Sequence, residues 1–262
     1  GTKAPGIEAP PRVAGNMAAA FEPRVVKAGN RGPFTLDGTR TFLVGRKTAV
    51  VIDPGPDVDQ HVRALSRALA DSRDIHILLT HGHGDHAGAA GPLAGRLGGA
   101  PILGPPSAGF SSLEDGERIP SDQGELVTVL TPGHTRDHVA FYWPQARALF
   151  AGDLILGRGS TTWLGEYPGC IADYLETLDR VQRLDLDVIY PAHGPPVRDP
   201  HRVLGAFRDH RLDRLKQVAR ILRENPDASV EELVMGVYGS KLPPRLVKAA
   251  SSSIDVMVHH LN

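Results

Sequence analysis

The pattern of hydrophobic and polar positions divides the chain into a mixed part and a helical tail. Apolar residues recur every three or four positions at 58–69 and 171–184, which predicts amphipathic helices. Short apolar runs bounded by turn residues predict β-strands, and these runs lie at 41–44, 48–52, 75–79, 101–103, 126–130, 139–143, 148–151 and 188–190. This mixture of strands and helices predicts an α/β sandwich of several layers.

Three segments follow from this pattern. Residues 1–20 are rich in Ala, Pro and Gly without an apolar period, so we expect a flexible N-terminal arm. Residues 21–199 contain the predicted strands and form the expected main domain. Residues 200–262 form the expected helical domain, in which Ser229 and Glu232 make a capping-box pattern at the start of the second helix.

Composition and charge restrict the class of protein. The 262 residues are 41% hydrophobic and 23% charged, which is typical of a soluble globular protein. No segment approaches the roughly 18 to 20 continuous apolar residues that span a bilayer, so no membrane contact is expected. The one cysteine, Cys170, excludes an internal disulfide, and we expect it to pack in the core of a cytoplasmic protein. The net charge of −1 excludes no class of partner, and the oligomeric state stays open.

Candidate chemistry is concentrated just after the predicted strand 75–79. Three histidines and one carboxylate follow it: His81, His83, Asp85 and His86. Gly82 and Gly84 would let this loop turn tightly. Imidazole and carboxylate are the usual ligands of Zn(II), and burying four such groups without a cation is costly. A solvated histidine-rich loop is the alternative, but the strand before it and the fixed carboxylate spacing favour a metal site.

Four more ligand-type residues follow predicted strands elsewhere in the chain. They are Asp53, His134, Asp153 and His193. A lone Asp or His at the end of a strand is more often structural. Together, however, strand ends at one edge of a sandwich would bring all four to the histidine-rich loop. The sequence therefore predicts one metal centre built from several strand ends.

The motifs around these residues resemble those of the metallo-β-lactamase superfamily in order and spacing, over residues 35 to 197. The motifs are Ile52-Asp53-Pro54-Gly55, Thr80-His81-x-His83-x-Asp85-His86, Pro132-Gly133-His134-Thr135, Gly152-Asp153 and Pro191-Ala192-His193-Gly194. The resemblance implies a four-layer αββα sandwich with a binuclear metal centre. It also implies that the domain of residues 21–199 is catalytic.

The resemblance further implies a role for each residue. One Zn(II) would be held by His81, His83 and His134, and a second by Asp85, His86 and His193. Asp153 would bridge the two ions, and Asp53 would orient a ligand imidazole. A hydroxide bridging the ions would be the nucleophile, because metal-bound water has a pKa of about 7. Asp85 would orient this hydroxide and protonate the leaving group.

Other segments resemble the β-lactamase-like-protein-2 group of this superfamily. They are residues 39–44, 154–157, 173–178 and the tail from His210. Members have a small winged-helix-like C-terminal domain, and the mitochondrial animal member cuts single-stranded RNA. Asp153 agrees with this group, because true β-lactamases of the superfamily lack the bridging carboxylate that hydrolases of phosphodiesters and thioesters have. Arg40 departs from the group, which often has Asn there; Arg40 either contacts an anionic substrate or replaces a turn residue.

The sequence therefore predicts a di-zinc hydrolase of an anionic substrate, with phosphodiester cleavage in single-stranded RNA as first choice. The basic first helix of the tail favours RNA, although a solvated helix face is an equal alternative. Trp163 and Tyr167, in the loop after Asp153, would line the mouth of the site for base stacking, or would simply pack. A thioesterase or glyoxalase-II-like hydrolase is the alternative, with weak β-lactam hydrolysis as a side activity.

Two further classes of protein fit the residues less well. Persulfide dioxygenases of the superfamily share the early His-x-His-x-Asp-His run but bind one iron through two His and one Asp. Here all seven ligand positions are filled, which favours two metals. The full ligand set also disfavours a non-catalytic binding module that has kept the fold.

Overall fold

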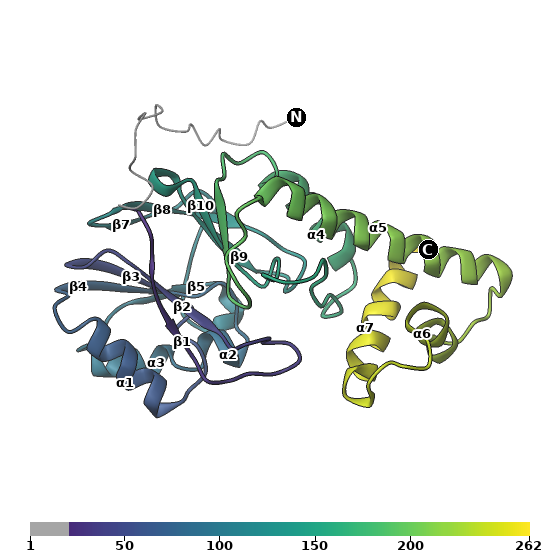
Figure 1. Cartoon of the computed structure of the whole chain (residues 1–262), viewed down its shortest axis with the longest axis horizontal. Helices are drawn as coiled ribbons and strands as arrows, with labels where there is room; N and C mark the ends of the chain where they lie inside the picture. Colours follow the sequence, from purple (N-terminus) through teal and green to yellow (C-terminus); the bar gives the residue numbers. More distant parts are fainter. Residues whose placement is uncertain (1–20) are drawn as a thin grey trace.

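Two β-sheets are stacked face to face between layers of helices in the computed structural model, which describes residues 21–262 (Figure 1). The first sheet has the strand order β1 (Arg24–Lys27), β2 (Arg40–Val44), β3 (Thr48–Ile52), β4 (Asp74–Leu78), β5 (Ile102–Gly104) and β6 (Ser111–Ser112). The second has the order β11 (Val188–Pro191), β10 (Ala148–Gly152), β9 (Val139–Trp143), β8 (Gly124–Leu130) and β7 (Arg118–Ser121). The expected N-terminal arm, residues 1–20, lies outside the described residues.

The apolar runs form strands because both faces of each sheet are covered. In β3, Val50 and Ile52 belong to the core between the sheets, whereas Ala49 and Val51 pack under the helices on the outer side. A strand that is buried on both faces needs an almost continuous apolar run. The predicted hairpin of residues 41–53 is confirmed as the antiparallel pair β2 and β3.

Helices form the two outer layers. The first sheet is covered by α1 (Asp59–Ala68) and α3 (Ala90–Arg96), and the second by α4 (Cys170–Val181) and the start of α5 (Pro200–Glu224). Leu65 of α1 and Leu178 of α4 are fully buried in these outer cores. The predicted αββα order is therefore confirmed (Figure 1). Cys170 is a buried free thiol, as predicted.

The hydrophobic pattern does not predict three strands that lie at or near sheet edges. The sequence does not predict β1, β6 or β7, and the segment 104–117, expected as a surface loop, contains β6 and the 3-10 helix η2 (Pro106–Ala108). A second 3-10 turn, η3 (Pro144–Ala146), joins β9 to β10. β6 consists of two exposed serines. An edge strand is held by backbone hydrogen bonds to one neighbour, so it needs no apolar period.

Three helices form the C-terminal part of the chain. α5 continues beyond the sandwich and is followed by α6 (Val230–Tyr238) and α7 (Pro244–Leu261) (Figure 1). The predicted capping box of α6 is confirmed, because Ser229 Oγ accepts a hydrogen bond from Glu232 N and Glu232 Oε2 accepts one from Ser229 N. Residues 200–262 contain no strand, so the winged-helix-like expectation is wrong about the wing. The connections between these helices are too short to form a β-hairpin.

The last helix contacts the sandwich again. Ser253 Oγ of α7 donates a hydrogen bond to Leu164 O at 2.5 Å, and Trp163 Nε1 donates to Ala249 O at 3.2 Å. The C-terminal helices therefore share an interface with the loop that follows β10. No helix among residues 21–262 has both the length and the apolar character that crossing a membrane requires.

Candidate metal centre

Five segments that follow strands of the two sheets bring the ligand-type side chains together. In the first sheet, β3 precedes Asp53 and β4 precedes the run from His81 to His86. In the second sheet, β8, β10 and β11 precede His134, Asp153 and His193. The side chains meet at one edge of the sandwich, which is the arrangement expected from the strand ends.

The run after β4 is more regular than expected. Asp85 and His86 lie on α2 (Gly84–Ala87), a single helical turn, where the sequence predicts an irregular loop. Neither Gly82 nor Gly84 has a positive φ, so the chain turns here without a left-handed glycine. Gly82 serves close packing instead, because a Cβ atom there would lie 3.1 Å from Ser107 O.

The first group of converging side chains consists of His81, His83 and His134. His81 Nε2 lies 3.0 Å from His83 Nδ1, and His134 Nε2 lies 3.2 Å from the same atom. Two of the outer nitrogens are held in place: His81 Nδ1 lies 3.0 Å from Thr80 Oγ1, and His134 Nδ1 donates to Trp163 O at 2.9 Å. Fixing the outer nitrogen of an imidazole aims its inner nitrogen at the centre.

The second group consists of Asp85, His86 and His193. Asp85 Oδ2 lies 3.2 Å from His193 Nε2 and 3.5 Å from His86 Nε2. The ring of His86 is held from behind, because its Nδ1 lies 2.9 Å from Asp53 Oδ2. Each group therefore supplies three ligand atoms, which is the number that a catalytic site with an open position uses.

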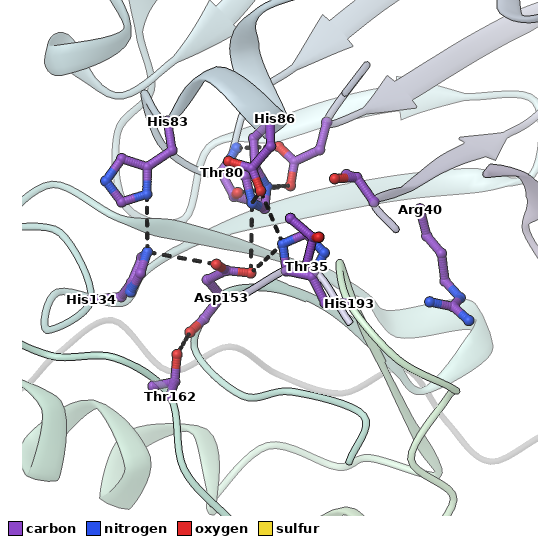
Figure 2. A network of polar contacts seen from close by, with 12 residues as sticks. Thr35, Arg40, Thr80, His83, His86, His134, Asp153, Thr162 and His193 are labelled. Carbon is purple, nitrogen blue, oxygen red and sulfur yellow. Dashed lines mark hydrogen bonds and ion pairs between the residues drawn. The ribbon is translucent and has the colours of Figure 1, made fainter. Parts of the chain in front are cut away.

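Asp153 lies between the two groups (Figure 2). Its Oδ1 lies 3.3 Å from His193 Nε2 and 3.6 Å from His86 Nε2. Its Oδ2 lies 3.7 Å from His134 Nε2. The carboxylate thus presents one oxygen to each group, as a ligand bridging two ions about 3.5–4 Å apart would do.

Asp53 joins the β3 and β4 segments behind the centre. Its Oδ1 accepts a hydrogen bond from Thr80 N, and its Oδ2 accepts one from Thr80 Oγ1, both at 2.8 Å. The same carboxylate contacts His86, so one side chain fixes both the loop and a ligand ring. The backbone of Asp53 is left-handed, with φ 49°, a conformation that Asp tolerates better than most residues.

The buried polar atoms of the centre fit divalent cations. His86 Nε2, His193 Nε2 and Asp153 Oδ1 are buried and have no hydrogen-bond partner among the described residues. Buried polar atoms normally have a partner, and imidazole nitrogen with carboxylate oxygen is a typical donor set for Zn(II) or iron. Burial lowers the pKa of His81 and of His134, which favours the neutral imidazole that coordinates a metal.

Carboxylates and imidazoles of the centre stabilise each other's charged forms. Burial disfavours ionisation of Asp153, but His86 and His193 outweigh burial and hold the pKa of this carboxyl well below its usual range. Burial likewise disfavours a charge on His86, but Asp153 and Asp53 outweigh it and raise the pKa of this imidazole. The ionised carboxylate of Asp153 favours a cation at the centre.

Comparison with known families agrees with this geometry. The model of the metallo-beta-lactamase superfamily matches residues 35–121 and 101–193, which include both groups and Asp153. The chain belongs to the metallo-β-lactamase superfamily. Members are generally hydrolytic enzymes that bind metal ions, usually in a binuclear centre, and the two groups of this chain are candidate metal sites of that kind.

Individual metallo-β-lactamase relatives resemble most of the chain. A Beta-lactamase-like protein 2 homolog of Caenorhabditis elegans is 30% identical over 245 residues, 88% of this chain and 81% of that protein, which confirms the resemblance to this group. An atrochrysone carboxyl ACP thioesterase of Aspergillus chevalieri is 32% identical over 233 residues, 83% of this chain and 74% of that protein. A β-lactamase domain protein of Burkholderia ambifaria shares the fold, with a TM-score of 0.79, 19% identity, and coverage of 94% of this chain and 86% of that chain.

A buried histidine that the sequence does not single out, His138, lies beside the metallo-β-lactamase centre of this chain. Asp153 N donates to His138 Nε2 at 3.3 Å, so the proton of the ring lies on Nδ1, 2.7 Å from Thr131 Oγ1. Gly152 has φ 49°, and a Cβ atom there would lie 2.7 Å from His138 Nε2. The signal in the sequence is weak, because a histidine just before a predicted strand is common.

A cavity of about 750 Å³ opens on the metallo-β-lactamase centre. His83, Asp85, His134 and Asp153 line it on the side of the sandwich, and Trp163 lines it at the junction with α7. The opposite side, which we call the helical wall, is formed by residues of the C-terminal part: His210, Arg211, Arg214, Tyr238, Leu242, Arg245, Leu246, Lys248, Ala249, Ala250, Ser252 and Ser253. The cavity therefore lies between the metal centre and the helical domain.

The three residues expected to contact substrate are placed differently from one another. Trp163 lines the cavity, with its ring centroid 5.8 Å from that of His134. Arg40 does not line the cavity, because both of its terminal nitrogens donate to the Asp37 carboxylate (Figure 2 shows Arg40 to one side). Tyr167 does not line it either, because its ring is buried and its hydroxyl donates to Asp173 at 2.7 Å. Packing therefore explains Tyr167, and an ion pair explains Arg40.

Proposed function

We propose that this metallo-β-lactamase superfamily hydrolase uses two Zn(II) ions to hydrolyse an anionic acyl thioester. The observation that carries the proposal is the cavity between the metal centre and the helical wall. It is lined by carboxylates and imidazoles of the metal centre, by the apolar side chains of Leu156, Leu242 and Leu246, and by Lys and Arg side chains of the helical wall. An acyl thioester has a reactive carbonyl, an apolar segment and an anionic leaving group, so its chemistry matches these surfaces.

The relatives support a thioester substrate over the RNA that the sequence favours. The similar protein of Aspergillus chevalieri is named as an ACP thioesterase, and so is a protein of Aspergillus terreus that is 29% identical over 246 residues. The apolar stretch of the cavity supports the same choice. A polynucleotide bears a phosphate at every residue and requires basic side chains along its whole path.

The chain's own residues supply positioning and proton transfer. Bound zinc ions would polarise the thioester carbonyl and lower the pKa of water to about 7. Asp85 lines the cavity, and its side chain is 30% exposed, so it can contact both water and substrate. Its carboxylate accepts the proton of the attacking water and returns it to the sulfur as the C–S bond breaks, which yields an acid and a thiol.

Cleavage of single-stranded RNA is the second candidate function. It is favoured by the four Lys and Arg side chains of the helical wall and by the similarity to the Beta-lactamase-like protein 2 homolog. Trp163 and Tyr238 line the same cavity and offer surfaces on which bases can stack.

A substrate panel with zinc-loaded protein tests these functions. The panel contains an acyl-coenzyme A, S-lactoylglutathione, single-stranded RNA, bis-p-nitrophenyl phosphate and nitrocefin. We expect a kcat/KM for at least one thioester that exceeds the other values and falls by about 10²-fold or more in Asp85→Asn, while the exposed control Asp227→Asn leaves it unchanged. RNA cleavage without thioester hydrolysis would reverse the order of the two candidates. Metal analysis of the protein as isolated accompanies the panel, because one iron per chain would favour a dioxygenase.

A further inference from the structure

The helical wall contains a buried cation without a charged partner, Arg211. This residue of α5 is only 4% exposed. Its Nη2 donates to Thr162 O at 2.9 Å, and its guanidinium lies 5.8 Å from the centre of the Tyr174 ring. Its Nε has no hydrogen-bond partner among residues 21–262, and no carboxylate of those residues forms an ion pair with it.

An arginine in this environment indicates an anionic ligand. Burial of a charged group without an opposite charge is strongly unfavourable, and arginine keeps its charge at all physiological pH values. Arg211 lines the cavity and keeps an unused donor, so a ligand in the cavity is available to pair with it. Guanidinium pairs best with the oxygens of phosphate or carboxylate.

The other charged residues that line the cavity also indicate an anionic ligand. Arg214, Arg245 and Lys248 also lie on the helical wall, and Arg245 and Lys248 are exposed on α7 without an ion pair to residues 21–262. Both carboxylates that line the cavity, Asp85 and Asp153, belong to the metal centre. The cations that line the cavity therefore lie on the helical wall, and its carboxylates lie at the metal centre. A phosphate pairs well with several such cations, because its oxygens accept charge-assisted, bidentate hydrogen bonds from guanidinium groups.

The loop after β10 connects the helical wall with the metal centre. Thr162 O accepts the hydrogen bond from Arg211, while Thr162 Oγ1 donates to Asp153 O at 2.9 Å (Figure 2). One residue thus fixes Arg211 relative to the carboxylate between the two metal groups. A ligand that contacts Arg211 is held at a defined position with respect to the reacting bond.

We propose that Arg211, Arg214, Arg245 and Lys248 form a phosphate subsite for the leaving group of the substrate, a phosphopantetheine thiol. The phosphate lies against the helical wall while the thioester carbonyl lies at the metal centre, and the uncharged pantetheine arm contacts the apolar residues that line the cavity. The inference deepens the proposed thioesterase function and rests on it. Coenzyme A and acylated carrier proteins share this phosphate.

Calorimetric titration of the zinc-loaded full chain tests the subsite without any need for turnover. The two ligands are 4′-phosphopantetheine and pantetheine, which differ only in the phosphate. We expect the phosphorylated ligand to bind about 10- to 100-fold more tightly, since charge-assisted hydrogen bonds contribute that much. The double variant Arg245→Gln/Lys248→Gln, whose residues are exposed, loses most of this preference, as does Arg211→Gln. The control Arg220→Gln, on the same helix but outside the cavity, keeps it.

The outcomes test the phosphate subsite separately from the proposed thioester hydrolysis. Equal affinity of the wild type for the two ligands overturns the subsite, and so does a preference that survives in both helical-wall variants. Thioester hydrolysis with equal affinities rejects the subsite alone. A phosphate preference without thioester hydrolysis supports the subsite and rejects the proposed reaction. Where both hold, kcat/KM for acyl-coenzyme A and for an acylated carrier protein identifies the source of the phosphopantetheine.

Discussion

The two sides of the cavity are built in different ways. On the sandwich side, the ligand-type atoms of each group lie within 4.8 Å of one another, and buried partners such as Asp53 hold them from behind. On the helical side, Arg245 and Lys248 are long, exposed side chains without ion pairs among the described residues. The ligands of the sandwich side are therefore held in one geometry, whereas the exposed side chains of the helical side can change conformation. We infer that the sandwich side determines which bond is broken, and the helical side determines which molecule is held.

The largest effect is expected at the carboxylate between the two metal groups. Asp153→Asn removes the charge shared by both groups, so we expect the zinc content to fall below two per chain and activity to fall by about 10³-fold or more. Elemental analysis and kcat/KM measure the two effects. Full metal occupancy with normal activity in this variant would contradict the inference that the sandwich side determines which bond is broken.

A smaller effect is expected at Asp53, which contacts the outer nitrogen of the His86 ring. In Asp53→Asn the amide keeps the oxygen that accepts from Thr80 N, but its NH₂ replaces the oxygen that faces Thr80 Oγ1 and His86 Nδ1. Loss of such a partner lowers metal affinity by about 10- to 100-fold. Competition with a chromogenic chelator measures this affinity. Phosphopantetheine affinity should not change in protein saturated with zinc, since Asp53 does not line the cavity.

The junction of the two sides is tested at Gly165. A Cβ atom there would lie 2.6 Å from Ser252 Oγ and 3.0 Å from Ser252 C, so Gly165→Ala displaces α7. We expect a loss of about 1–3 kcal/mol in the free energy of unfolding, and weaker phosphate preference with unchanged zinc content. Gly205→Ala on α5 is the matched control, because no atom lies within 4 Å of its Cβ position. A stable Gly165→Ala protein with unchanged ligand affinity would mean that α7 does not shape the cavity.

The smallest effect concerns the buried thiol of Cys170, the first residue of α4. Burial raises the pKa of Cys170 to about 11, so at pH 8 only about one thiol in a thousand is ionised, and reaction with iodoacetamide should be slow in the native protein. The rate rises with pH towards that value. Mass spectrometry with and without urea measures the protection. Rapid native labelling at pH 8 would show that α4 and α5 separate readily.

Local patterns predict the sandwich side of the centre better than the helical side. The seven positions from His81 to His193 could be grouped because each follows an apolar run, and such runs end at sheet edges. His138 was not predicted, because no local sequence pattern marks a histidine whose ring accepts a hydrogen bond from Asp153 N. Arg211 was only one of several basic residues in a helical period, and its burial depends on how α5 packs on residues some fifty positions earlier. The alternatives left open for Arg40 and Tyr167 could not be decided from the sequence for the same reason, since their partners Asp37 and Asp173 are ordinary in sequence.

The division of the ligands between two sheets has a mechanical consequence. Asp53 and the His81–His86 run belong to the first sheet, while His134, Asp153 and His193 belong to the second, so ions at the centre would cross-link the two halves of the sandwich. Folding and metal availability then become thermodynamically linked. Above the dissociation constant, each tenfold rise in free metal adds about 1.4 kcal/mol per site to the free energy of unfolding. Scarcity of metal would weaken the protein as a structure as well as an enzyme, and the abundance of this chain in a cell would follow the supply of its ions.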